Sequence, residues 1–74
     1  MFKITAEDIE LTKSSSLKFF KTPEGRPLFN LLLNFVLGID SDDVSDNEIE
    51  SYSNKIIDEM VTKHNKGIIR EARD

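Results

Sequence analysis

The densest run of apolar positions in the chain is residues 27–38, in which only Asn30 and Asn34 are polar. If this run is a helix, it is hydrophobic around nearly its whole circumference, and such a helix must be covered by other elements on most sides. The run therefore predicts either the central helix of a small bundle or a helix that is half core and half interface. Gly38 is placed to end it in the left-handed conformation that glycine adopts easily.

The start of this helix has two interpretations. Thr22, Pro23 and Glu24 have the signature of a helix N-terminus, with a capping threonine, a proline at the first helical position and an acid in the first turn. Pro27 conflicts with that start, because it lacks the N–H that would bond back to the carbonyl of Pro23. The second interpretation is a bend at residues 25–26, followed by a regular helix that starts at Pro27.

A second apolar pattern lies downstream and repeats every three or four residues, which is typical of an amphipathic helix with one buried face. Its members are Ile49, Tyr52, Ile56, Ile57, Met60 and Val61. Ser45 and Glu48 precede it with the spacing of a capping box, in which each side chain accepts a hydrogen bond from the other residue's backbone N–H. We expect a helix from 46 to 64 or beyond, with Gly67 as a candidate end.

The N-terminal part of the chain is ambiguous between helix and strand. Thr5, followed by two acids, is a suitable N-cap for a helix over 6–12. The serine-rich stretch 13–16 then predicts a loop or a helix cap, and residues 17–21 predict a short second helix.

The alternative for this part is a β-hairpin over about 8–21, which the β-propensity of its Ile, Thr and Phe residues favours. In the helical interpretation, the adjacent residues Phe19 and Phe20 cannot share one face. We expect one of the two rings in the core and the other on a neighbouring helix or at an interface.

These elements predict one all-α domain over residues 1–74, a small bundle of three to four helices with residues 27–37 at its centre and a tail at 68–74 that frays. The alternative fold class is α+β, with the hairpin packed on two helices. A chain of 74 residues buries only about 60% of the surface it exposes when unfolded. Its single core should supply only about 3–5 kcal/mol, so small domains of this size lean on disulfides, metals or oligomerisation.

Of these three supports, the composition favours oligomerisation or a partner. The sequence has no cysteine, which excludes disulfides, and His64 is its only histidine, so the usual Cys and His ligand sets for a metal cannot be assembled. Isolated glycines form no phosphate-binding loop. We therefore expect no metal, no cofactor and no small-molecule substrate.

Charge is distributed unevenly, although the net charge is only -4. A stretch at 40–50 holds six carboxylates and no cation: Asp40, Asp42, Asp43, Asp46, Glu48 and Glu50. Net acidity argues against nucleic acid as a partner, because binding to phosphates needs clustered Lys and Arg. The second alternative is a DNA-binding regulator of the helix-turn-helix type. The last predicted helix carries residues that could contact DNA, namely Asn54, Lys55, Lys63 and Asn65, but it also carries several acids that would repel phosphates.

Two candidate sites fail on inspection of their residues. The acidic stretch can be compared with a calcium-binding loop that starts at Asp40. It does not match, because Val44, Ser45 and Ser51 stand where that motif needs an oxygen ligand, a glycine and a glutamate. A lone histidine near a helix end is usually a solvated residue, and the serines at 14–16 have no histidine close in sequence. We expect no enzyme activity.

The sequence also bears on where the protein works. Its N-terminus has no secretory signal pattern, and its apolar run is shorter than the ~20 residues that cross a bilayer. We expect a cytoplasmic protein with no membrane contact. The amino-acid composition, rich in Lys, Asn, Ile, Asp and Ser, is typical of proteins from AT-rich bacterial, phage or mobile-element genomes. Small acidic accessory proteins of such genomes often adapt or inhibit a host protein.

Together these observations predict a small acidic interaction module that acts as an adaptor, inhibitor or regulator of a larger protein. Its predicted partner-binding residues are apolar on the central helix and acidic after it: Leu28, Phe29, Leu32, Phe35, Val36, Asp40, Asp42, Asp43 and Asp46. The acidic ones are expected to steer a basic partner. The first alternative is a structural or assembly protein that forms a homo-oligomer.

Overall fold

A computed structural model describes residues 4–73, and within this range it contains three α-helices, two single 3-10 turns and no strand. In chain order the elements are α1 (Ala6–Phe20), α2 (Arg26–Leu37), η1 (Ser41–Asp43), η2 (Asp46–Glu48) and α3 (Ile49–Arg73). The predicted all-α bundle is thereby confirmed, and the alternative with an N-terminal hairpin is wrong.

Helix α1 is continuous through the serine-rich stretch where the sequence predicted a loop or a helix cap at 13–16. Its N-terminus carries a capping box: the Asp8 N–H donates to Thr5 Oγ1, and the Thr5 N–H donates to Asp8 Oδ2, each over 3.1 Å. Leu17 and Phe20 then pack into the core. Serine is only a weak helix breaker. The capping box at one end of α1 and the core packing at the other outweigh its low propensity, so the two predicted short helices form one continuous helix.

The corner between α1 and α2 is tight. The Thr22 hydroxyl donates to the Phe19 carbonyl over 2.6 Å and accepts from the Gly25 N–H over 3.0 Å. A Cβ atom on Gly25 would lie 1.9 Å from the Phe19 carbonyl oxygen, so the close approach of α2 to the last turn of α1 requires glycine. Helix α2 begins at Arg26, one residue before the predicted start at Pro27, and the turn before it spans residues 21–25. The rival start at Pro23 is wrong.

Helix α2 ends as predicted, because Gly38 adopts the left-handed conformation with φ of 68°. Its N–H donates to the Asn34 carbonyl, and the N–H of Ile39 donates to Leu33. The chain then passes through η1 to the predicted capping box of Ser45 and Glu48, which is present at the entrance to α3.

Helix α3 begins at Ile49 after the single turn η2 and continues past residue 64 to Arg73. Gly67 therefore does not end it. Fraying of residues 68–74 stays a prediction, and Asp74 lies outside the described residues.

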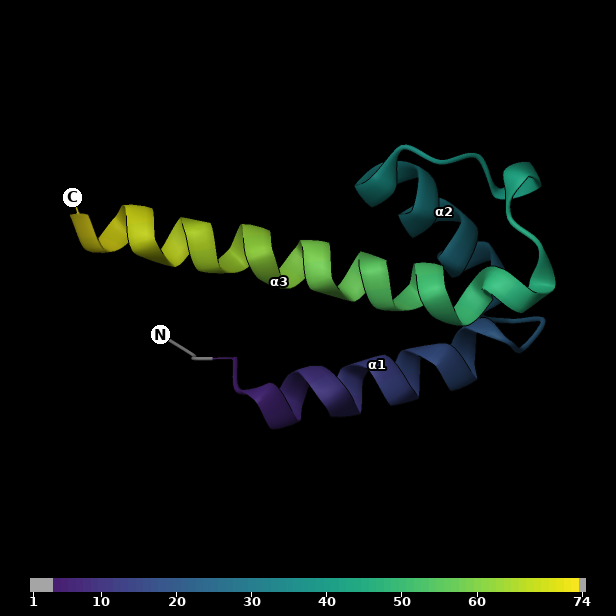
Figure 1. Ribbon diagram of the computed structural model, residues 1–74, viewed down its shortest axis with the longest axis horizontal. Coiled ribbons are helices and arrows are strands. Elements are labelled where there is room, and N and C mark those ends of the chain that lie inside the picture. Colours follow the sequence, from purple (N-terminus) through teal and green to yellow (C-terminus); the bar gives the residue numbers. More distant parts are fainter. Residues whose placement is uncertain (1–3, 74) are drawn as a thin grey trace.

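The core lies where α2 crosses the N-terminal half of α3, while α1 runs antiparallel beside α3 (Figure 1). Its buried side chains come from every long element: Phe20, Phe29, Leu33, Val44, Ile49 and Ile56. The rings of Phe20 and Phe29 are 5.4 Å apart, a favourable aromatic contact. The protein measures 42 × 24 × 18 Å with a radius of gyration of 13.6 Å, against about 11 Å for a compact domain of this length. An elongated molecule with a small core leaves much apolar surface uncovered.

Candidate functional site

One face of α2 carries apolar side chains that the rest of the described fold does not cover. Leu28 is 41% exposed, Leu31 is 64% exposed and Phe35 is 84% exposed. At roughly 100° per residue these three positions fall within an arc of about 60° around the helix. We call this set, Leu28, Leu31 and Phe35, the apolar stripe.

Phe19 extends the apolar stripe onto the corner with α1. Its ring is 45% exposed, and its Cδ2 atom would lie 2.9 Å from a Cβ on Gly25, at the start of α2. Leu28 follows Gly25 by three residues, so both lie on one side of the helix. Phe20 is buried, which confirms the predicted core ring, and Phe19 is exposed. A contact of the Phe19 ring at an interface stays a prediction.

The five predicted apolar contact residues fall into three groups. Leu28 and Phe35 are exposed and belong to the apolar stripe. Leu32 and Val36 are half-buried and pack against the core. Phe29 is fully buried and is not available to a partner in this fold.

Leu31, by contrast, belongs to the apolar stripe but was not among the predicted contact residues. A helix that is apolar all round gives no sign of which side faces the core, so Leu31 and Phe29 could not be told apart from the sequence. The one available signal was the seven-residue spacing of Leu28 and Phe35, which puts both on one face of the helix together with Leu31.

The acidic residues predicted to bind a partner, Asp40, Asp42, Asp43 and Asp46, are all exposed. Asp46 lies 3.4 Å from the Arg26 guanidinium, whose Nε donates to Asn30 Oδ1 over 3.2 Å. Arg26 lies about 140–180° around α2 from the apolar stripe. The structure therefore places Asp46 on the opposite flank of α2 from the apolar stripe.

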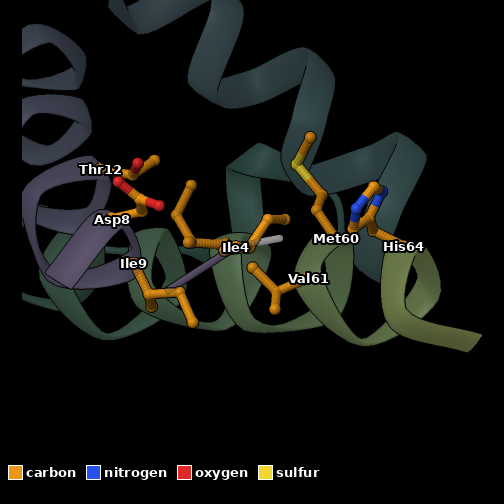
Figure 2. Close-up of a pocket in the computed structure, with 8 residues that line it drawn as sticks. Ile4, Asp8, Ile9, Thr12, Met60, Val61 and His64 are labelled. Atoms are coloured by element: carbon orange, nitrogen blue, oxygen red, sulfur yellow. The ribbon is translucent and has the colours of Figure 1, made fainter. Parts of the chain in front are cut away.

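A groove of about 570 Å³ lies between the N-terminal half of α1 and the middle of α3. Figure 2 shows its lining, with Asp8, Ile9 and Thr12 from α1 on one side, Met60, Val61 and His64 from α3 on the other, and Ile4 between them. The Thr5 backbone N–H, and then the Thr5 side chain, hold the pKa of Asp8 below its ordinary value. That carboxylate is committed to the helix cap, so the groove is mainly an apolar surface.

The part of the chain that the structure describes holds neither a metal-binding cluster nor a membrane-spanning helix. Within residues 4–73, where side chains are described as far as residue 65, no group of three or more His, Asp or Glu side chains is arranged to hold a metal ion. None of the helices in this range combines the length and the apolar character needed to cross a bilayer. The apolar stripe is the surface that stands out.

Comparisons of the chain with protein-family models, with curated proteins and with solved structures find no match in any of the three.

Proposed function

We propose that this protein is a protein–protein interaction module and that the apolar stripe is its contact surface. The observation that carries the proposal is the exposure of Phe35, 84% in a helix whose adjacent face forms the core. Aromatic side chains are enriched in interfaces, and an exposed helical row of apolar side chains is a common mode of partner recognition. In this role the protein acts as an adaptor, inhibitor or regulator of the protein it contacts.

The acidic segment, residues 40–50, is the second part of the proposal. Its carboxylates steer a basic protein partner by long-range attraction, which raises the association rate at low salt. Because Asp46 lies on the far flank of α2 from the apolar stripe, a basic partner that contacts Asp46 approaches from a different side. The absence of cysteine from all 74 residues supports a reducing compartment, and we place the protein in the cytoplasm.

Site-specific photocrosslinking tests the proposal. A photoreactive amino acid replaces Leu31 in the apolar stripe, and the matched control replaces Leu11, which is 59% exposed on α1. After irradiation in cells that make the protein, we expect covalent protein adducts from position 31 and far fewer from position 11. Equal labelling from both positions, or none from position 31, would show that the apolar stripe is not a contact surface.

The acidic segment is tested in the same cells. Replacing Asp42 and Asp43 with lysine should lower the recovery of a basic partner at low salt and have little effect at high salt, because salt screens the attraction between exposed charges. Unchanged recovery at low salt would remove the steering role and leave the apolar stripe as the only contact.

A further inference from the structure

We propose that the occupant of the apolar stripe is the same stripe of a second copy of this chain, with the two α2 helices packed antiparallel about a two-fold axis. This inference rests on the proposed function, since it takes the apolar stripe to be a contact surface and names its partner. Three features of the described residues lead to it.

The first feature is that the centre of the contact is uncharged. The only charged residue in α2 is Arg26, and it lies on the opposite flank, beside Asp46. Two apolar stripes placed face to face therefore bring no like charges together, which would otherwise weaken the association. A two-fold contact also requires a self-complementary patch: antiparallel packing sets Leu28 against Phe35 of the second copy and leaves Leu31 near the axis.

The second feature is the charge at the two ends of α2, which fixes the direction of packing. Exposed Lys18 and Lys21 flank Phe19 at the corner before α2, against one acid, Glu24. The chain after α2 carries Asp40, with further aspartates in η1. Antiparallel packing places the lysine end of each copy near the aspartate end of the other, and it opposes the positive and negative ends of the helix dipoles. Parallel packing would set like ends together.

The third feature is the small core. The described residues bury seven apolar side chains, Phe20, Phe29, Leu33, Val44, Ile49, Ile56 and Ile57, with no cysteine to cross-link them. Chains of this size commonly gain stability by oligomerising. A contact between single helices is at the small end of stable interfaces, so the dimer should dissociate on dilution.

Molar mass as a function of concentration gives the first test. We expect light scattering after gel filtration to report the monomer mass of 8.5 kDa at low micromolar concentration and twice that mass near millimolar concentration. Phe35→Ser should stay a monomer throughout, and Leu31→Asp serves as a second variant, with circular dichroism to confirm that both stay helical. Leu11→Ser, the matched control on α1, should dimerise as the parent does; a dimer that survives Phe35→Ser would overturn the proposal.

Single cysteine variants test the antiparallel geometry, because the parent chain has no cysteine to interfere. Leu31→Cys should form a disulfide-linked dimer under mild oxidation. Leu28→Cys and Phe35→Cys should each cross-link poorly alone and efficiently when mixed, since antiparallel packing sets these two positions opposite each other. Efficient cross-linking of Leu28→Cys with itself and of Phe35→Cys with itself would overturn the antiparallel arrangement.

The failure of this inference can be told apart from the failure of the proposed function. A monomer at every concentration, together with photocrosslinks from position 31 to a different protein, would overturn the second copy and leave the interaction surface standing. A monomer with no crosslinks from position 31 would overturn both.

Discussion

Ser53 is fully buried on α3, and within the described residues its hydroxyl oxygen has no hydrogen-bond partner. A buried polar group without a partner loses its bonds to water and gains none in return. Removing the hydroxyl should therefore stabilise the fold.

We expect Ser53→Ala to raise the free energy of unfolding by about 1 kcal/mol, which raises Tm by about 4–8 °C in a domain of this size. Thermal unfolding followed by circular dichroism checks this, with exposed Ser51→Ala as the control, which gains only the higher helix propensity of alanine and should raise Tm less than Ser53→Ala does. A lower Tm for Ser53→Ala would mean that the hydroxyl makes a bond that stabilises the protein.

The two phenylalanines of α2 have opposite surroundings, Phe29 with no exposed surface and Phe35 with 84% of its surface exposed. Phe29→Ala should cost about 3–5 kcal/mol, comparable with the whole stability of so small a domain, about 3–5 kcal/mol. Phe35→Ser should change the stability of the dilute monomer by less than about 0.5 kcal/mol.

Urea unfolding at low protein concentration checks both expectations. A loss of helix in Phe35→Ser as large as that in Phe29→Ala would mean that the Phe35 ring packs within its own chain.

At the scale of the elements, the two glycines that bound α2 are needed for different reasons. A Cβ on Gly25 would lie 1.9 Å from the backbone oxygen of Phe19, whereas Gly38 has open space around it but a φ of +68°. We expect Gly38→Ala to cost about 1–2 kcal/mol, the usual penalty of the left-handed conformation. Gly25→Ala should cost more, about 3 kcal/mol, because two helices must move apart.

Urea unfolding of the two glycine variants compares their free energies of unfolding. Equal costs, or a larger cost for Gly38→Ala, would contradict the tight corner between α1 and α2.

Two capping boxes make the helix starts sensitive to acid. Hydrogen bonds from the hydroxyl and then the backbone N–H of Ser45 lower the pKa of Glu48, and the bonds from Thr5 lower that of Asp8. A carboxyl whose pKa is lower in the folded state stabilises the fold above its ordinary pKa and loses that contribution as pH falls through the folded value. For Glu48 the loss therefore begins near its ordinary pKa of 4.5 and is complete below the lowered one.

Glu48→Gln tests this, because glutamine keeps an oxygen that accepts from the Ser45 N–H but does not titrate. The variant should lose less stability than the parent between pH 5 and the acid limit of folding, about pH 3. Glu50→Gln, which removes a carboxylate in the first turn of α3, is the control and should follow the parent. If Glu48→Gln lost stability in acid as steeply as the parent, the capping box would not be the cause.

The sequence predicted those parts of the elements that depend on local chemistry. The capping box at Ser45, the helix end at Gly38 and the amphipathic α3 all follow from a few neighbouring residues, and all are present. It failed in the serine-rich part of α1, where contacts with residues distant in sequence favour one continuous helix: Phe20 packs against Phe29 in the core, and Lys13 Nζ lies 2.9 Å from Asp58.

For the candidate site, the sequence identified the helix but not its exposed side. Leu28, Leu31 and Phe29 are chemically alike on an apolar helix, and only the position of α3 decides which of them is buried. Nor do local signals show that the chain after α2 turns back toward Arg26, which separates Asp46 from the apolar stripe.

At the scale of the whole molecule, the elongated shape and small core link stability to assembly. A dimer that forms only from folded chains stabilises the folded state by mass action, so Tm rises with protein concentration. We expect the Tm of the parent to rise by several degrees between micromolar and near-millimolar concentration. The Tm of Phe35→Ser should not change with protein concentration. An equal rise in that variant would show that the concentration dependence of Tm does not come from the apolar stripe.

The Arg26–Asp46 ion pair lies on the flank of α2 away from the apolar stripe. Its position also determines how many docking sites the dimer offers to a partner. Closing two apolar stripes on each other leaves Asp46 of each acidic segment facing outward, beside Arg26 on the opposite flank of α2. The dimer then offers two identical docking sites, and a basic partner that presents its own sites in pairs would be held by avidity, more tightly than either site alone allows. A protein of 74 residues would in this way favour paired or repeating targets over single ones.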